Sequence, residues 1–429
     1  MAAQQPRVVI TGIGVLTPIG LGVEKMWSAL LAGTSGVKPI QSFDASGLPI
    51  RIGGEIRDFD AKDYIDKKER KSLKVMARPI QMGVGCTTLA LRDAALEPAK
   101  LDPTRFGISF GAGLIASELD ELGPASVASC EGHPNTVDLR KWGEVGLANM
   151  PPLWLLKYLP NMPACHDSIL HNAQGPSNTI TESEVAALLA IGEGAAVIRR
   201  GAADVMLTGA TDSKINPLSL TRLSLFAPLS KRNEEPEKAS RPFDRRRDGI
   251  VPGEGTGILV LEALEHAQKR GARIYGEIVG FGAAFDLKRN GEGLARAITT
   301  ALRKAGIGPD QIDHVNAQGF STIRDDAWEA RGLWKVFGET QPKVPVFAAK
   351  SYFGNLGAGS GPVELAISLL AQQHGVLPPN LNYEEADPEL PPIAVLTGRR
   401  HEVRSPYFLK ISFTDMGQCG ALVVKKWQE

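Results

Sequence analysis

The sequence predicts an α/β protein, because short apolar runs suited to buried strands alternate with helical patterns along the chain. The most informative segment is a Gly-Pro turn followed by residues 185–198, whose small and apolar side chains suit a buried helix. Arg199 and Arg200 suit the last turn of this helix and Gly201 its C-terminal cap. The clearest strand candidates are residues 7–12, 205–209, 256–261 and 421–425.

Composition excludes several classes of protein. The chain has 429 residues, 43% of them hydrophobic, which is enough for a large core. Lys plus Arg and Asp plus Glu both number 48, so no overall field favours nucleic acid. No apolar run of about 18 residues or more suggests a membrane span, and the first residues lack a secretory pattern. The cysteines have neither metal-ligand nor disulfide spacing, so we expect a reduced cytoplasmic protein without metal; they are Cys86, Cys130, Cys165 and Cys419.

Four sequence stretches carry a resemblance to a known family. In order, they are residues 8–20 (VVITGIGVLTPIG), 241–255 (RPFDRRRDGIVPGEG), 314–319 (HVNAQG) and 350–357 (KSYFGNLG). Together with the Gly-Pro segment, they resemble the β-ketoacyl-ACP synthases of fatty-acid and polyketide biosynthesis over nearly the whole chain. The segment Gly12-Ile13-Gly14 alone is weak evidence for a dinucleotide-binding motif, since Thr17 stands where that motif has its third glycine.

The resemblance implies a thiolase-like fold, with two similar halves forming a five-layered αβαβα architecture. It places an N-terminal half with a cap insertion at residues 1–265 and a C-terminal half at residues 266–429. The sequence has no clear internal repeat, so this duplication is implied by the resemblance alone. The region from about residue 117 to 161 is expected to cap the core and to contribute to a dimer contact.

Members of this family carry a growing acyl chain on a cysteine and use two histidines in decarboxylation and condensation. Counting without a gap from Gly175 forward and from Gly201 back puts the cysteine position at Glu184. The histidine positions fall on Gln318 and Asn355. A carboxylate is a poor acyl carrier, and amides do not shuttle protons near neutral pH. The resemblance therefore implies a family member without condensing activity.

Other residues match the family site. Lys350 matches its lysine, while Asp326 and Glu329 match acidic residues that brace the site. Because Glu184 stands at the position of the family's nucleophile, we expect an ion pair between Glu184 and Lys350 that closes the former active site. The alternative is that Lys350 and Glu329 are structural ion-pair members.

The positions expected to meet substrate also depart from the family. Phe320 replaces a threonine that helps to hold the phosphopantetheine arm, while Thr322 keeps its counterpart. In the C-terminal gating loop Phe413 survives, but Asp415 and its neighbours replace small or aromatic residues. No cofactor is expected beyond the phosphopantetheine of an acyl carrier protein, as a substrate arm.

A basic run corresponds to the family's docking patch for the acidic helix of an acyl carrier protein. A solvated surface is the alternative interpretation of such a run. Its members are Lys67, Lys68, Arg70, Lys71 and Lys74. Cys165 with His166, and separately His314, invite a catalytic interpretation, but packing is the favoured one.

Three functions are compatible with these residues. The first is a non-condensing partner of an active ketosynthase, similar to the chain-length factors of aromatic polyketide systems. The second is an enzyme in which Glu184 acts on an acyl thioester, with Gln318 and Asn355 as oxyanion donors. The third is a homodimeric, carrier-protein-binding scaffold. The resemblance implies a partner that is a catalytic homologue in a heterodimer, or a second copy, and it places the contact along the strand near residues 178–181.

Overall fold

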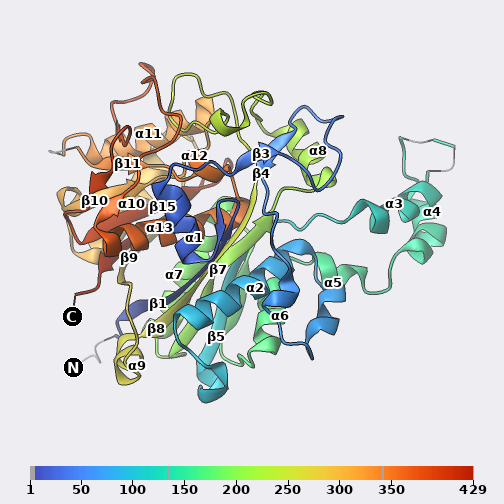
Figure 1. The fold of residues 1–429 in the computed structure, drawn as a ribbon, viewed down its shortest axis with the longest axis horizontal. Coiled ribbons are helices and arrows are strands. Elements are labelled where there is room, and N and C mark those ends of the chain that lie inside the picture. Colours follow the sequence, from blue (N-terminus) through green and yellow to red (C-terminus); the bar gives the residue numbers. More distant parts are fainter. Residues whose placement is uncertain (1–4, 131, 134, 341–342, 429) are drawn as a thin grey trace.

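A computed structural model describes residues 5–130, 132–133, 135–340 and 343–428. Its largest sheet runs in the order β13-β11-β10-β15-β16-β9-β1-β8-β7-β5-β6, with β2 paired to β1 (Figure 1). The strands of the first half are β1 (Val8–Thr17), β2 (Gly20–Leu21), β5 (Phe106–Ala112), β6 (Ser177–Ile180), β7 (Val205–Ser213) and β8 (Glu254–Ala263). Those of the second are β9 (Gly276–Phe285), β10 (Ile312–Asn316), β11 (Pro345–Phe347), β13 (Ala394–Val395), β15 (Tyr407–Phe413) and β16 (Gln418–Lys426).

The two halves repeat one strand pattern. In the first half, β1, β8 and β7 are antiparallel neighbours, and β5 and β6 continue the sheet in parallel with β7. In the second half, β9, β16 and β15 are antiparallel neighbours, and β10 and β11 continue the sheet in parallel with β15. A short pairing of Val9 with Glu277 and Ile10 with Gly276 joins the two halves. The expected division after residue 265 falls inside α9 (Leu264–Lys269) and remains a prediction.

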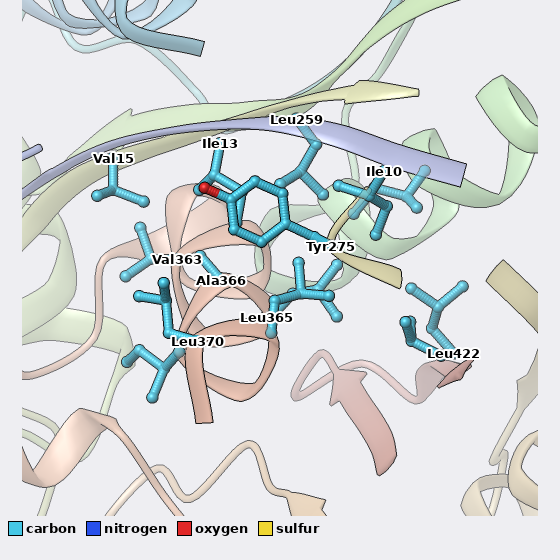
Figure 2. Close-up of a cluster of buried hydrophobic side chains, with 14 of the residues drawn as sticks. Ile10, Ile13, Val15, Leu259, Tyr275, Val363, Leu365, Ala366, Leu370 and Leu422 are labelled. Atoms are coloured by element: carbon cyan, nitrogen blue, oxygen red, sulfur yellow. The ribbon is translucent and has the colours of Figure 1, made fainter. Parts of the chain in front are cut away.

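Helices complete five layers, so the predicted thiolase-like architecture is confirmed. Two central helices, α7 (Ala186–Arg199) and α13 (Ser360–His374), lie between the sheets of the two halves. α2 (Arg78–Asp93) covers the outer face of the first sheet, and α10 (Glu292–Ala305) and α11 (Ile323–Phe337) lie outside the second. Figure 2 shows α13 side chains facing β1 and β8, with Val363, Ala366 and Leu370 opposite Ile13, Val15 and Leu259.

The expected strands and the main helix all form, and the strands are longer than predicted. Residues 205–209, for example, form the start of β7, which continues to Ser213. The remaining helices are α1 (Val23–Leu31), α3 (Leu119–Ala128), α4 (Leu139–Lys141), α5 (Trp154–Tyr158), α6 (Met162–Leu170), α8 (Pro217–Phe226) and α12 (Lys350–Phe353). Short strands β3 (Val37–Pro39) and β4 (Ile52–Gly54) pair with each other, as do β12 (Val376–Leu377) and β14 (His401–Glu402).

The expected cap is formed only in part. α5 packs on the body, where Trp154 and Tyr158 join a core cluster with Ile65 and Met76. The segment of α3 and α4 instead projects away from the layers at the right of Figure 1. It carries apolar side chains in water, including Val127 at 75% and Leu139 at 82% exposure. Across the described part of the chain, no helix is both long and apolar enough to span a bilayer.

A glycine in β5 determines how closely the start of α7 approaches the sheet. A Cβ at Gly111 would lie 2.6 Å from the nitrogen of Ala187 and 2.7 Å from the carbonyl carbon of Ala186. Both are backbone atoms of the helix, so the contact cannot be relieved by turning a side chain. Gly111 therefore helps to place the turn that precedes α7.

We predict that Gly111→Ala lowers the free energy of unfolding by about 1–3 kcal/mol, because the added methyl forces α7 away from β5. Urea unfolding followed by circular dichroism measures this. Gly47→Ala is the matched control, since a Cβ there meets no atom within 4 Å. Equal stability of the two variants would contradict the close-packing argument.

Candidate functional site

Glu184 lies in the turn between β6 and α7, as the strand-turn-helix prediction expects. Ser183–Val185 form a single 3-10 turn that leads into the helix. Ser183 has a φ of 48°, in the left-handed region that non-glycine residues rarely adopt. The tight turn leaves the Glu184 side chain partly exposed at the N-terminal end of α7, where the helix dipole favours a negative charge.

Asn355 holds the Glu184 carboxylate. Its Nδ2 donates a hydrogen bond of 2.9 Å to Glu184 Oε1. The orientation of the Asn355 amide is set from the other side, because Oδ1 accepts from the nitrogen of Gly357 and from Ser360 Oγ, both at 3.2 Å. The structure therefore brings into direct contact two of the three positions at which the sequence predicts a replaced catalytic residue.

Gln318 joins the same group through Ser412. Ser412 Oγ lies 2.6 Å from Gln318 Oε1 and 3.0 Å from the carbonyl oxygen of Glu184. A serine hydroxyl has one proton, so it donates to one acceptor at a time, and the shorter contact to Gln318 is favoured. Gln318 is fully buried, and its Nε2 has no hydrogen-bond partner among the described residues.

The expected ion pair between Lys350 and Glu184 is wrong. Lys350 Nζ instead lies 2.5 Å from Glu364 Oε1 on α13, and Lys410 Nζ lies 2.6 Å from Glu364 Oε2. All three side chains are almost completely buried. Lys350 is directed into the middle layer, where a buried carboxylate needs a cation more than the partly exposed Glu184 does. The alternative of a structural ion pair for Lys350 fits this arrangement.

Sequence reasoning missed Lys410 and Glu364. Both are single charged residues inside apolar runs, the β15 sequence YFLKISF and the α13 sequence GPVELAISLL, and that pattern is a usable signal of a buried pair. Lys410 Nζ also donates to the carbonyl oxygen of Ala317 at 3.1 Å, directly before Gln318. Burial lowers the pKa of Lys410, although the neighbouring Glu364 opposes this.

Two acidic residues brace the loop that carries Gln318. Glu329 accepts hydrogen bonds from the backbone nitrogens of Gln318 at 2.6 Å and Gly319 at 2.8 Å. Asp326 accepts from the nitrogens of Ser321 and Phe243. Burial raises the pKa of both carboxyl groups. These contacts are with the backbone, so both residues fix the loop rather than face the site.

Aromatic packing determines the positions of Phe320 and Phe413. Their ring centroids lie 5.3 Å apart in an edge-on arrangement, and Trp328 packs against Phe413 at 4.4 Å. Both phenylalanines are buried. Thr322 caps α11 by accepting from the nitrogen of Asp325, and its hydroxyl donates to the Asp325 carboxylate. Its expected role in holding a pantetheine arm stays a prediction.

Asp415 lies in the exposed part of the loop between β15 and β16. Partial burial raises the pKa of its carboxyl group, and the charges of Glu184 and Asp325 raise it further. The electrostatic influence of Glu184 shows that these two carboxylates share one region.

The basic run lies on and before the 3-10 turn Arg70–Val75. Its lysines, Lys67, Lys68, Lys71 and Lys74, are exposed. Arg70 is half-buried, and its guanidinium donates to the carbonyl oxygen of Lys62 at 2.7 Å. Four of the five predicted docking residues therefore present their charge to solvent.

Among the remaining candidates, His166 and His314 are buried and Cys165 is partly exposed. His166 is 9% exposed, and Cys165 lies 3.3 Å from Asn161 Nδ2. His314 lies 2.9 Å from both Ser368 Oγ and Asp313 Oδ2, which gives a serine-histidine-aspartate order. Ser368 and His314 are completely buried, so no substrate reaches this group and it is structural. In the described ranges, no group of three or more His, Cys, Asp or Glu is arranged to hold a metal ion.

Two family models match the chain. The N-terminal domain of beta-ketoacyl synthase matches residues 5–267, and the C-terminal domain matches residues 275–384. A 3-oxoacyl-[acyl-carrier-protein] synthase 2 of Vibrio harveyi is 35% identical over 430 residues, covering 99% of each chain.

Solved structures of related proteins have the same fold. The ishigamide ketosynthase/chain length factor superposes with a TM-score of 0.86 at 29% identity, covering 99% of this chain and 100% of that one. AntDE:AntF, described as a type II PKS acyl-carrier protein in complex with its ketosynthase bound to the hexaketide, gives 0.85 at 27% identity, covering 99% and 100%.

Proposed function

The chain belongs to the beta-ketoacyl synthase family, and on that premise we propose that it is a non-condensing member that pairs with an active ketosynthase. Relatives of this family act in fatty-acid and polyketide biosynthesis, and one structural relative is a ketosynthase/chain length factor. We assign this chain the role of the chain-length-factor-type partner.

The observation that carries the proposal is the hydrogen bond between Asn355 Nδ2 and Glu184 Oε1. It joins the altered cysteine position to one altered histidine position, so the two side chains satisfy each other instead of facing a substrate. An acyl group on a carboxylate is an anhydride, which water hydrolyses readily. Neither Asn355 nor Gln318 exchanges protons near neutral pH, so the decarboxylation and condensation steps lack their proton-handling groups.

A partner subunit has a suitable place to dock. β6 is the last strand of the sheet, and among the described residues β5 alone pairs with it. Apolar side chains of the neighbouring segment stay exposed, among them Ile169 at 75%. An open strand edge beside exposed apolar surface favours association. An acyl carrier protein is the second proposed partner, meeting the exposed lysines of residues 67–74.

We predict that the purified protein takes no acyl group from acyl-ACP and forms no condensation product, because Glu184 cannot form a stable thioester. Intact-mass measurement after incubation with acyl-ACP checks the first point, and product analysis with malonyl-ACP checks the second. A covalent acyl adduct would contradict the proposal.

The variant Glu184→Cys separates the role of the nucleophile from that of the amides. We expect it to remain inactive in elongation, since Gln318 and Asn355 still lack proton-transfer capacity. The triple variant that also carries Gln318→His and Asn355→His is the comparison. Robust elongation by Glu184→Cys alone would show that the altered histidine positions do not limit the chemistry.

We predict that charge reversal of Lys67, Lys68 and Lys71 weakens carrier-protein binding about tenfold and flattens its salt dependence, since exposed charges act through screened attraction. Titration calorimetry at low and high salt measures both effects. Charge reversal at Arg303, Lys304 and Lys335, on the outer helices of the other half, changes the same number of charges and is the matched control. Equal affinities of the two variants for the carrier protein would mean that the basic run is only a solvated surface.

We predict a dimer, with the catalytic homologue and also with a second copy when the chain is expressed alone. The nitrogen of Ile108 donates to the carbonyl oxygen of Pro176, and alternate residues of a strand bond the same neighbour. The backbone of Thr179 therefore faces the free edge. Thr179→Pro should weaken association by on the order of 2 kcal/mol, because each subunit loses one outward donor.

Sedimentation velocity over a concentration series measures this association. Thr179→Val is the control, because it keeps the backbone N–H and should associate as the unaltered chain does. A monomer at micromolar concentration that stays a monomer with the candidate partner would overturn the assignment of the interface.

A further inference from the structure

We propose that Asp167 and His171 form a pH-sensitive contact, in which both side chains are uncharged while α6 packs on α2, and that rising pH loosens α6. Asp167 lies on α6 and His171 directly follows its last residue. The inference concerns the contact between these two helices, so it does not depend on the role proposed for the Glu184 site.

Asp167 is enclosed between the helices with only one of its carboxyl oxygens paired. The residue has no exposed surface, and Oδ2 accepts a hydrogen bond of 2.9 Å from the Thr87 hydroxyl on α2. Oδ1 has no hydrogen-bond partner among the described residues. An ionised carboxylate in such a place is strongly disfavoured relative to the neutral acid, because water is excluded and one oxygen has no donor.

His171 is close to Asp167 but does not pair with it. Its Nε2 lies 3.8 Å from Asp167 Oδ1, which is beyond hydrogen-bond distance, and it has no hydrogen-bond partner in the described part of the chain. A buried ion pair is stable only when good geometry and further hydrogen bonds repay the desolvation of both groups. Since neither condition is met here, the neutral acid and the neutral imidazole are favoured over an ion pair.

The other groups around this contact supply no compensating charge. On α2, burial raises the pKa of the Cys86 thiol, and on α6 burial lowers the pKa of His166, so both stay neutral. The strands β5 and β6, which also contact α6, carry no ionisable side chain. On α5, Lys157 and Tyr158 both bind the carboxylate of Glu121.

His171 also lines an open pocket of about 320 Å³ at the end of α2, so water reaches the imidazole from that side. Two charged residues share this pocket: Arg92, which is exposed, and Glu97, which pairs with Lys100 at 2.8 Å. Charges in contact with water are screened and act weakly on an enclosed group. Burial therefore dominates the protonation of Asp167 and His171.

Burial shifts the two groups in opposite directions. It raises the pKa of Asp167 to about 8, although the hydrogen bond from Thr87 opposes this, and it lowers the pKa of His171 to about 4. In an unfolded chain the same side chains titrate at about 3.9 and 6.5. The stabilisation from neutral Asp167 is therefore complete below pH 4 and is lost as the pH rises to about 8. That from neutral His171 is complete above about pH 6.5 and is lost as the pH falls to about 4.

The raised pKa of Asp167 couples pH to the position of α6. At neutral pH the carboxyl group loses its proton only when α6 moves away from α2 and admits water. Each pH unit between about 4 and 8 then favours this opening about tenfold, because one proton is released. Residues 171–176 join α6 to β6, so the opening would also disturb the strand edge at which we proposed that a partner pairs.

The test compares urea unfolding of the full-length protein and of Asp167→Asn at one protein concentration, in steps from pH 5 to pH 7.5. Asparagine mimics the neutral acid, since its oxygen accepts from Thr87 and its amide group fills the same space. We expect the folding equilibrium constant of the variant, divided by that of the unaltered protein, to rise about tenfold per pH unit. Other titrating groups cancel in this ratio. Asp58→Asn, the same change at an exposed position, is the matched control and should give a constant ratio.

Two further measurements test the contact separately. The ratio for His171→Gln should fall about tenfold per pH unit as the pH rises from 4.5 to 6, and this holds the proposal to account if Asp167→Asn does not fold. Amide hydrogen exchange in residues 163–171 should accelerate about tenfold more per pH unit between pH 6 and pH 8 than exchange in α10, and Asp167→Asn should abolish the difference.

A ratio for Asp167→Asn that stays constant or falls as the pH rises would mean that Asp167 is charged in the folded protein, and it would overturn the proposal. A constant ratio for His171→Gln would likewise show that the imidazole is charged in the fold. Equal pH dependence of exchange in α6 and α10 would show that α6 does not open.

Discussion

The central constraint on this molecule is that α7 and α13 lie between two sheets and have almost no contact with water. Every residue of α13 from Ser360 to Gln372 is buried, and α7 is nearly as enclosed. In such a layer a side chain must be apolar, small or fully paired. The turn that leads into α7 carries Glu184 and the loop before α13 carries Asn355, so the buried layer also fixes the geometry of the site.

The same constraint explains the charges beneath the site. Glu364 points from α13 into the interior, and two lysines, Lys350 and Lys410, approach its two oxygens. Removing one partner of such a group leaves a buried charge without compensation, at a cost of about 3–5 kcal/mol. The group therefore holds β15, α12 and α13 together below the Gln318 loop. At the surface, by contrast, the carboxylates of Glu184 and Asp415 are partly or largely exposed to solvent.

Much of the fold can be predicted from the sequence, because the local apolar patterns agree with the strands and helices that form. The helix of residues 185–198 and the strands near residues 8, 205, 256 and 421 are apolar runs bounded by glycine or charged residues, and each forms. The family pattern also predicted site roles for Glu184, Gln318 and Asn355, and the structure places Glu184 in contact with Asn355 and Gln318 in contact with Ser412. The partner of Lys350 was not predicted, because the single charge of Glu364 inside an apolar run indicates that it is buried and paired but does not indicate which lysine it meets. The projection of the α3 and α4 segment could not be predicted either, since its apolar residues fit a cap packed on the core as well as a segment that projects into solvent.

The placement of β6 has a consequence for regulation. This strand has an open edge and ends at Ile180, four residues before Glu184, so the surface that a partner would extend and the carboxylate of the site belong to one short stretch of backbone. A difference in the turn at Ser183 between the free and the paired subunit would then change both the edge of β6 and the position of the Glu184 carboxylate. Thermodynamic linkage makes such coupling reciprocal: a ligand that binds the paired form more tightly must tighten the pairing by the same factor. The association constant of the subunits would thus depend on whether a ligand occupies the site, without a separate regulatory domain.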